Sequence, residues 1–401
     1  MRPHQPWEVF PLPHRKHTRK YAARPIGAIV SGVVLALGLP ASAFESPPIP
    51  WLPAQYTCPR LASPPAIDGR PDEAAWSTAP WSASFTDIQG PLAAEPRLRT
   101  RVRMGWDDAY FYVGATLDEP HVWGTLVERD AVIYHDNDFE VFIDPDGDNH
   151  LYGELEINAL GTVWDLLLAR PYRDGGPAID QWDITGLKSA VAVDGTLNDP
   201  RDHDRGWTVE LAIPWKALGP IAGRACPPAP GDVWRVNFSR VEWHAEARDG
   251  GYRKITDAAT GRALPEDNWV WSPQGIIAMH CPEMWGEVLF DDGAGSAGAR
   301  AVATSTEHAR LAMANGLMPI YYRQQARREA TGAYAAHLAE LGVPTGHWLL
   351  WPGDAPNAPT APLPDGWNLE MTGGSDWFRA TLTTPLGMAV IDDSGKLERT
   401  P

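Results

Sequence analysis

Hydrophobic and polar residues alternate with a period of two between Tyr134 and Leu168, which predicts paired β-strands in this stretch. The apolar positions of the two central strands are Phe139, Val141, Ile143, Leu155 and Ile157. Side chains two residues apart in a strand share a face, so these positions are expected to pack on a core. The opposite face carries polar side chains at Glu140, Glu154, Glu156 and Asn158.

A row of carboxylates on paired strands is electrostatically unfavourable. Like charges on neighbouring strands repel one another unless cations, hydrogen bonds or a polar ligand compensate them. We therefore expect the function of the protein on this face.

The same alternation recurs along much of the chain. Residues 99–106 and 109–117 are expected to form a hairpin around Asp107 and Asp108, and DEAAW at 72–76 to form a short helical turn. Further strands are expected at 162–168, 207–213, 234–241 and 285–290. Strands separated by turn signals, with almost no helical periodicity, predict an all-β fold, an antiparallel β-sandwich of the immunoglobulin or jelly-roll type, over residues 44–292.

The pattern changes after residues 293–300, a small and polar segment that is expected to be a linker. Residues 301–401 are predicted to form a small α+β appendage. Its first part, 304–341, is rich in helix-forming residues divided by Pro319 and Gly332. Tyr334, Leu338 and Leu341 are expected on one helical face, and strands at 378–382 and 388–391. We favour a helix that packs back on the sandwich; the alternative is an appendage that binds an envelope protein.

Residues 1–43 have the pattern of an export signal. Basic residues precede a short apolar stretch from Ile26 to Leu39, and Ala41-Ser42-Ala43 fits a small-residue cleavage site. The apolar stretch is short for a membrane span, although an uncleaved anchor is the alternative. The mature protein is therefore expected to start near Phe44, in the periplasm or outside the cell.

The net charge of −17 limits the classes of partner that the protein is expected to bind. Nucleic acids and anionic membrane surfaces attract basic faces, so an acidic protein is a poor partner for either. Soluble neutral ligands fit this charge better.

Export also bears on the three cysteines, Cys58, Cys226 and Cys281. An oxidising compartment permits a disulfide, and three cysteines allow three single pairings. The sequence does not choose among them; we favour Cys58–Cys226, because both lie beside proline-rich entries to expected strands.

Several segments together resemble carbohydrate-binding family 9 modules and their exported relatives. The matching segments, in order over residues 66–290, are AIDGRPDEAAW, VRMGWDDAYFYVGATLDEP, DNDFEVFIDPDGDNHLYGELEINALGTVWDL, GWTVELAIPWKAL, GDVWRVNFSRVEW and NWVWSPQGIIAMHCPEMWGEVLF. This resemblance implies a β-sandwich in exported proteins that handle polysaccharides. It also implies a terminal sugar held between two aromatic rings, structural calcium and no catalytic activity.

The resemblance carries over to the binding site only in part. Tyr134 falls near one clamping ring, and Glu140 matches a carboxylate that contacts the ligand. Met279 falls near the second ring but is not aromatic, and Glu156 stands where a sugar-contacting arginine would be. Binding of the same sugars is therefore not implied.

Sugar binding needs aromatic faces for stacking and planar polar groups for pairs of hydroxyls. The candidate ligand-binding residues are Tyr134, Glu140, Glu154, Glu156, Asn158 and Met279, with Glu210 and Asn237 also expected on the polar face. Rings near the rim could come from Trp164, Trp243, Trp269 and Trp271, for which core packing is the alternative.

The DPDGDN sequence from Asp144 to Asn149 is a candidate metal site. Asp144, Asp146 and Asp148 alternate around a glycine, as in loops that wrap calcium with oxygen ligands. Leu155 stands where an EF-hand has its glutamate, and a solvated hairpin turn is the alternative.

Two other functions remain open. Glu140 with Glu154 or Glu156 could serve as the paired acids of a glycoside hydrolase. Met279, His280 and His244 could ligate a b-type haem, although these residue types are often used for packing. We favour an exported, non-catalytic protein that binds carbohydrate in polysaccharide catabolism, with calcium as a structural cofactor.

Overall fold

The computed structural model of the chain describes residues 44, 46–293, 301–351 and 360–400. The expected export signal and almost all of the expected linker lie outside the described residues. No helix in the described ranges is long and apolar enough to cross a membrane.

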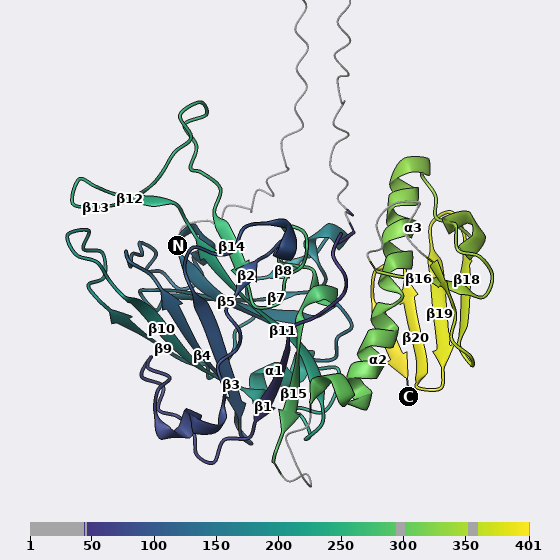
Figure 1. Cartoon of the computed structure of the whole chain (residues 1–401), viewed down its shortest axis with the longest axis horizontal. Coiled ribbons are helices and arrows are strands. Elements are labelled where there is room, and N and C mark those ends of the chain that lie inside the picture. Colours follow the sequence, from purple (N-terminus) through teal and green to yellow (C-terminus); the bar gives the residue numbers. More distant parts are fainter. Residues whose placement is uncertain (1–43, 45, 294–300, 352–359, 401) are drawn as a thin grey trace, which may run out of the picture. The chain divides into compact units, whose positions relative to one another are not determined.

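Two large β-sheets form most of the part of the protein that precedes residue 293 (Figure 1). The first sheet has the order β1 (Gln55–Pro59), β15 (Gly286–Asp291), β11 (Val233–Glu242), β5 (Asp138–Asp144), β6 (Tyr152–Asn158), β7 (Val163–Leu168) and β8 (Ala178–Ile179), with β14 (Asp267–Val270) beside β11 and β2 (Thr86–Asp87) beside β14. The second sheet has the order β3 (Thr100–Trp106), β4 (Tyr110–Asp118), β10 (Gly206–Pro214) and β9 (Lys188–Asp194). Neighbouring strands are antiparallel except β1 and β15, which are parallel. The predicted all-β sandwich is confirmed.

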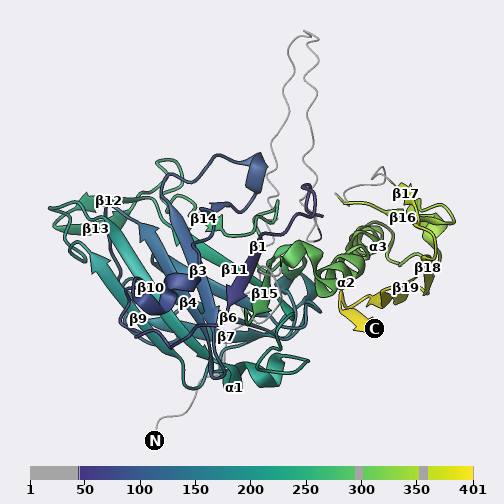
Figure 2. The same ribbon diagram turned by 60° about the horizontal axis from the view of Figure 1, so that its bottom comes forward.

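The two sheets face each other (Figure 2). One large apolar core lies between them. Phe139, Val141 and Ile143 contribute to it from β5, and Val209 and Leu211 from β10; all are buried. The alternation of the sequence thus correctly indicated the core face of these strands. Burial of so many large side chains is the main force that holds the sheets together.

Short elements connect the strands of the sandwich. They are the helical turns η1 (Ala74–Thr78), η2 (Gly90–Leu92), η3 (Ile133–His135), η4 (Tyr172–Asp174), α1 (Trp215–Leu218), η5 (Gly219–Ile221) and η6 (Pro282–Met284), and the hairpin of β12 (Ala245–Arg248) and β13 (Gly251–Lys254). The helical turn expected at DEAAW is η1, which buries Trp76.

The cysteines do not pair: all three are free in the structure. Cys58 is buried in the core between the sheets, and Cys226 packs against the same core with its thiol donating to the carbonyl of Trp215 at 3.3 Å. Cys281 is buried in a separate apolar cluster with Ile49 and Met284. The expected Cys58–Cys226 disulfide is therefore wrong, and packing explains where these side chains lie.

The C-terminal part combines helices with a four-stranded antiparallel sheet. Its elements are η7 (Val302–Thr304), α2 (Thr306–Asn315), α3 (Met318–Thr331), η8 (Leu338–Leu341), the pair β16 (His347–Leu349) and β17 (Thr360–Pro362), and the sheet β18 (Asn368–Gly373), β19 (Phe378–Thr384), β20 (Gly387–Asp392) and β21 (Leu397–Thr400). Helix α3 and the sheet share an apolar core that includes Tyr321, Phe378 and Ile391.

One expectation for this part is wrong. Helix α3 ends at Gly332, whose φ of 82° is the left-handed conformation that commonly terminates a helix. Tyr334 therefore follows the helix, while Leu338 and Leu341 belong to the separate turn η8. The three side chains still contribute to one apolar core, but they do not share a helical face.

The helices contact the sandwich through buried polar side chains. Arg235 on β11 donates from Nη2 to Asn315 at the end of α2 at 2.8 Å, and Arg173 donates to the hydroxyl of Tyr322 on α3 at 3.1 Å. The interpretation that the helical segment packs back on the sandwich is confirmed.

Candidate functional site

Neighbouring strands bring the predicted acidic residues together. Strands β5 and β6 pair so that Glu140 lies opposite Glu156, Phe142 opposite Glu154 and Asp138 opposite Asn158. Directly opposite residues share a face of the sheet, and so do residues two apart. We call the four acids on this face, Asp138, Glu140, Glu154 and Glu156, the strand carboxylates.

The strand carboxylates are buried, which the sequence pattern did not indicate. Asp138 is 0% exposed, Glu156 2%, and Glu140 and Glu154 4% each. Phe142, Tyr152, Leu166, Leu168 and Trp285 form a second apolar cluster beside them. The face that was expected to be polar is therefore partly apolar and covered by other segments.

Few hydrogen bonds compensate this buried charge. The backbone N–H of Tyr134 donates to Oε2 of Glu156 at 2.9 Å, and that of Val241 donates to Oδ1 of Asp138 at 3.2 Å. Oδ2 of Asp138, Oε2 of Glu140 and Oε2 of Glu154 have no hydrogen-bond partner among the described residues. Three unpartnered carboxylate oxygens on one buried face are unusual for a folded protein.

Burial controls the protonation of the site. It raises the pKa of Glu140 to about 7, and it raises the pKa values of the other three strand carboxylates well above normal. His280 Nε2 lies 3.9 Å from Oε2 of Glu154, but burial lowers the pKa of His280 to about 3. A neutral imidazole supplies no positive charge to the cluster.

Aromatic side chains lie next to the strand carboxylates. Tyr134, in η3, is 39% exposed, and its ring centroid is 6.4 Å from that of Trp164 at an interplanar angle of 36°. Trp243 donates from its indole to the carbonyl of Tyr134 at 2.8 Å, and the Lys254 ammonium lies 3.2 Å from the centre of the Trp243 ring. Tyr134, Trp164 and Trp243 are therefore the predicted rings that the structure brings to this site.

Two other predicted ligand-binding residues have structural contacts. Asn158 donates to the carbonyl of Leu126 at 2.9 Å and accepts from the backbone N–H groups of Leu160 and Thr162. Met279 packs against the apolar cluster beside the site, and its carbonyl accepts from the Trp285 indole at 3.0 Å. The hydrogen bonds of Asn158 hold the loops around the site.

The remaining candidates on this face lie elsewhere or are already bonded. Trp269 and Trp271 belong to the core between the sheets, so their alternative assignment to packing is correct. Glu210 lies on β10 in the other sheet and accepts from the Trp76 indole at 2.8 Å. Asn237 does lie on the expected face, but its amide donates to the carbonyl of Ser272 at 3.0 Å.

Asp138 was missed as a site residue. It lies two residues before Glu140 on the same strand, so the period of two that identified Glu140 applies equally to it.

The aspartate loop, which we define as Asp144, Asp146 and Asp148, lies away from the rings. Each of these aspartates offers an oxygen within 4.8 Å of the others. Gly147, with a φ of 65°, makes the turn and donates to Asp144 at 2.9 Å.

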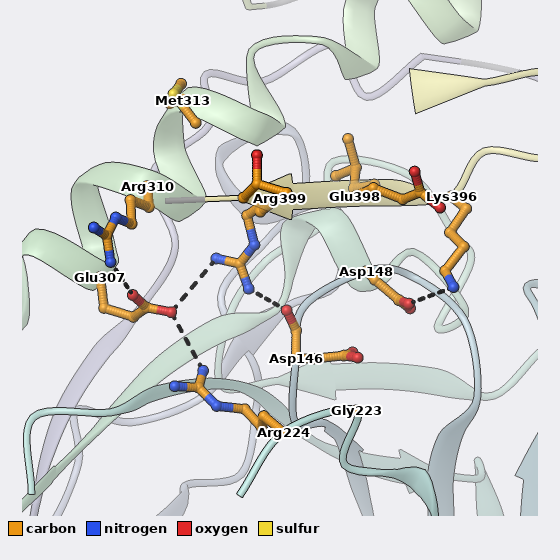
Figure 3. A pocket seen from close by; sticks show the side chains of 12 residues that line it. Asp146, Asp148, Gly223, Arg224, Glu307, Arg310, Met313, Lys396, Glu398 and Arg399 are labelled. Carbon is orange, nitrogen blue, oxygen red and sulfur yellow. Dashed lines mark hydrogen bonds and ion pairs between the residues drawn. The ribbon is translucent and has the colours of Figure 1, made fainter. Parts of the chain in front are cut away.

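Asp146 and Asp148 of the aspartate loop line a pocket of about 360 Å³ together with residues of α2 and β21 (Figure 3). Lys396 places its ammonium 3.2 Å from Asp148, and Arg399 donates to the carbonyl of Asp146. The loop thus keeps a donor set that suits calcium, with two cations of the protein already beside it.

The residues considered for haem have packing contacts. His280 is surrounded by the rings of Tyr152, Tyr172 and Phe142, and its Nδ1 is 3.0 Å from the Tyr152 hydroxyl. His244 lies 3.6 Å from Asp267. These contacts agree with the packing alternative.

Comparison with known proteins gives one matching family model and several solved structures to which the chain is similar. No curated protein matches the sequence at a significant level. A family 9 carbohydrate-binding module from Caldicellulosiruptor kristjanssonii in complex with cellotriose is 15% identical, with a TM-score of 0.38 over 61% of this chain and 98% of its own. A family 9 module from the same organism in complex with glucose is also 15% identical, with a TM-score of 0.39 over 62% of this chain and 100% of its own.

A third structure is that of a protein from Bacteroides uniformis ATCC 8492 to which a carbohydrate-binding role is attributed. It is 15% identical, with a TM-score of 0.44 over 59% of this chain and 99% of its own. The sequence model of the carbohydrate family 9 binding domain-like family matches residues 67–227. The predicted resemblance to carbohydrate-binding family 9 modules is therefore confirmed over residues 67–227. These residues include Tyr134 and the strand carboxylates.

Proposed function

We propose that this protein binds a carbohydrate at the site formed by Tyr134, Trp164 and the strand carboxylates. The observation that carries the proposal is the match of residues 67–227 to a carbohydrate-binding family. The site adds suitable chemistry, because a half-exposed tyrosine beside a second ring offers an apolar face to a sugar. Glu156 lies directly opposite Trp164 and accepts from the backbone N–H of Tyr134, so its carboxyl group lies beside these rings. Carboxyl oxygens accept hydrogen bonds from hydroxyl groups.

The test is a calorimetric titration of the purified protein with a panel of mono- and oligosaccharides. We expect one sugar class to bind, and Tyr134→Ala to weaken its affinity about tenfold or more, since aromatic contacts are worth about 1 kcal/mol or more beyond area burial. Tyr134→Phe keeps the ring and should retain most of the affinity. Trp377→Ala is the matched control, because Trp377 is 50% exposed in the C-terminal part. Equal binding by Tyr134→Ala and wild type would contradict the site.

We also propose that the protein is exported and acts in polysaccharide breakdown. The pattern of residues 1–43 supports export. Determination of the N-terminal residue of the protein from its native cell envelope or medium tests this; a terminus near Phe44 is expected, and a cytoplasmic protein that starts at Met1 would contradict it.

Two finer predictions belong with this proposal. Calcium in the aspartate loop is supported by the three convergent carboxylates, and it would have to compete with Lys396. An envelope protein as partner of the C-terminal part is tested by crosslinking of the full-length protein in intact cells: crosslinks from residues 301–401 to an envelope protein are expected, and crosslinks from the sandwich alone would contradict the prediction.

A further inference from the structure

The second sheet ends in two edge strands, β3 and β9 (Figure 1). The free edge of β3 is covered by an earlier segment of the chain. The backbone N–H of Ser82 donates to the carbonyl of Val102 at 2.7 Å, and that of Phe85 donates to β3 at the carbonyl of Thr100 at 2.9 Å. Strand β9 pairs with β10 alone, and in the described chain no other backbone-to-backbone hydrogen bond reaches residues 188–193. An uncovered edge strand presents a row of unpaired backbone N–H and C=O groups, which is a template for another strand.

The sequence of β9 lacks the usual protection of an edge strand. Natural edges commonly carry proline, a bulge or a charged residue within the strand, which discourages pairing with other chains. The central residues of β9, from Ser189 to Val193, contain neither proline nor charge, and they pair with β10 in an unbroken register. Ser189 is exposed, and residues 190–193 are half-buried. The free edge of β9 is therefore open to a strand from another chain.

Apolar side chains on and beside β9 pack against the core between the sheets but are only half-buried. They are Trp182, Leu187, Val191, Val193 and Leu197. On the covered edge strand β3, by contrast, Val102 and Met104 are fully buried. A second chain at the edge of β9 would therefore cover apolar surface in addition to pairing backbone groups.

The charges at the two ends of β9 favour a second copy of the same strand. Lys188 and Asp194 are exposed and lie on the face of the sheet that is turned away from the core, since Val191 between them packs against the core. In an antiparallel pair related by a two-fold axis, directly opposite residues lie on the same face. When Val191 lies opposite its own copy, Lys188 of each chain lies opposite Asp194 of the other. A shift by two residues would place Lys188 opposite Ala192 or Thr196, so only the register centred on Val191 pairs opposite charges.

Both charges are available for this contact. The ammonium of Lys188 lies 4.6 Å from the centre of the Tyr110 ring and forms no ion pair with a described carboxylate. Asp194 accepts from Nε of Arg205 of its own chain at 2.6 Å, and both side chains are exposed. The hydrogen bond from Arg205 and the charge of Arg70 lower the pKa of Asp194, which keeps it ionised. A carboxylate accepts about four hydrogen bonds, so Asp194 can bind a lysine in addition to Arg205.

We propose that the protein forms a symmetric dimer in which β9 pairs antiparallel with β9 of a second copy, centred on Val191. The two four-stranded sheets then join into one continuous sheet. The strand carboxylates lie on the other sheet, so the dimer does not depend on sugar binding and can be tested without a sugar.

Sedimentation equilibrium of the purified protein over a range of concentrations tests the dimer. We expect a reversible change from the mass of one chain to that of two as the concentration rises. Asp194→Lys places a lysine opposite Lys188 at both ends of the pairing and should raise the dissociation constant about tenfold or more, since like charges directly opposite are destabilising. Addition of Lys188→Glu to Asp194→Lys restores opposite charges and should restore the dimer. Glu370→Lys, at an exposed position of the edge strand β18, is the control and should change nothing.

Cysteine crosslinking tests the register. Val191→Cys brings two new thiols directly opposite each other, with Cα atoms about 4.5–5.5 Å apart, which suits a disulfide. Ser189→Cys is the control, because residue 189 lies opposite Val193 of the second copy and the two copies of residue 189 are therefore far apart. We expect mild oxidation to convert Val191→Cys into a covalent dimer and to leave Ser189→Cys and wild type as single chains on a denaturing gel.

Three results would overturn the proposal. Wild type that keeps the mass of one chain at every concentration would leave the edge of β9 to a different protein. A dimer that Asp194→Lys does not weaken and that Val191→Cys does not crosslink would mean that the two chains meet at another surface. Crosslinking of Ser189→Cys in preference to Val191→Cys would exclude the register centred on Val191.

Discussion

At the residue scale, the buried acids of this protein differ in how their charge is balanced. Glu119 and Glu242 share one guanidinium, since Nη2 of Arg240 donates to both carboxylates at 2.8 Å. All three side chains are buried. Arg97 also donates to Glu242 at 3.2 Å, so Glu242 has two arginine partners and Glu119 has one. Burial of Glu119 beside the carboxylate of Glu242 therefore favours a proton on Glu119 near neutral pH.

This arrangement makes stability depend on pH. Burial and the neighbouring Glu242 raise the pKa of Glu119 to about 8. A carboxyl whose pKa is higher in the folded than in the unfolded state binds its proton more tightly when folded. Its contribution to stability is therefore complete below about pH 4.5 and is lost as the pH rises towards 8.

We expect the free energy of unfolding to fall from pH 5 to pH 8 by on the order of 3 kcal/mol through this pair, at about 1.4 kcal/mol for each pKa unit. Glu119→Gln should flatten the slope and be more stable than wild type at pH 8. Urea unfolding at both pH values measures this, with the exposed Glu128→Gln as control. The same slope in Glu119→Gln and wild type would refute the assignment.

At the scale of elements, the strands were predictable and their surroundings were not. The period of two located β5, β6 and their core face, because each strand shows one face to the core of a sandwich. It could not show that the other face is buried as well, since Trp285 and Tyr134 reach it from distant and neighbouring parts of the chain. The sequence therefore indicated correctly which face of β5 and β6 carries the carboxylates, but it did not indicate that this face is buried.

For the aspartate loop, too, the local pattern was predictable and the contact with a distant segment was not. Its spacing predicted convergent oxygens, and these oxygens do converge. Lys396, which lies beside Asp148, comes from just before β21, near the far end of the chain. Nothing in the sequence around the loop indicates this contact.

Removal of this lysine should uncover the calcium affinity of the loop. Lys396→Met leaves Asp148 without its cation. We expect the free energy of unfolding to fall by about 1 kcal/mol at most, because the lysine is 39% exposed and the ion pair is therefore weak. Calcium should then raise the melting temperature of Lys396→Met more than that of wild type. Lys216→Met, an exposed lysine on α1, is the control. Equal calcium shifts in wild type and Lys396→Met would show that the loop does not take the ion.

At the scale of the whole molecule, the two-sheet sandwich and the α+β nature of the C-terminal part followed from composition and period. The way in which they contact each other did not, because it depends on individual polar side chains. Glu283 is fully buried; it accepts from Arg173 at 2.9 Å and from the hydroxyl of Tyr322. Arg235 bridges Asn149 and Asn315 in the same way. None of these residues is apolar or periodic, so no pattern marks them.

These buried contacts predict that the sandwich and the C-terminal part unfold together. Calorimetry of the purified protein should show one transition, and Arg173→Met should lower the stability of the whole by about 3–5 kcal/mol, because it leaves Glu283 buried without its cation. The double variant Arg173→Met, Glu283→Met should recover part of this loss, since removal of both charges leaves none unpaired. Arg201→Met, which removes an exposed arginine paired with Asp199, should have little effect. A second transition at lower temperature, affected alone by Arg173→Met, would instead mean that the C-terminal part melts independently and that the contacts at Glu283 do not couple the two.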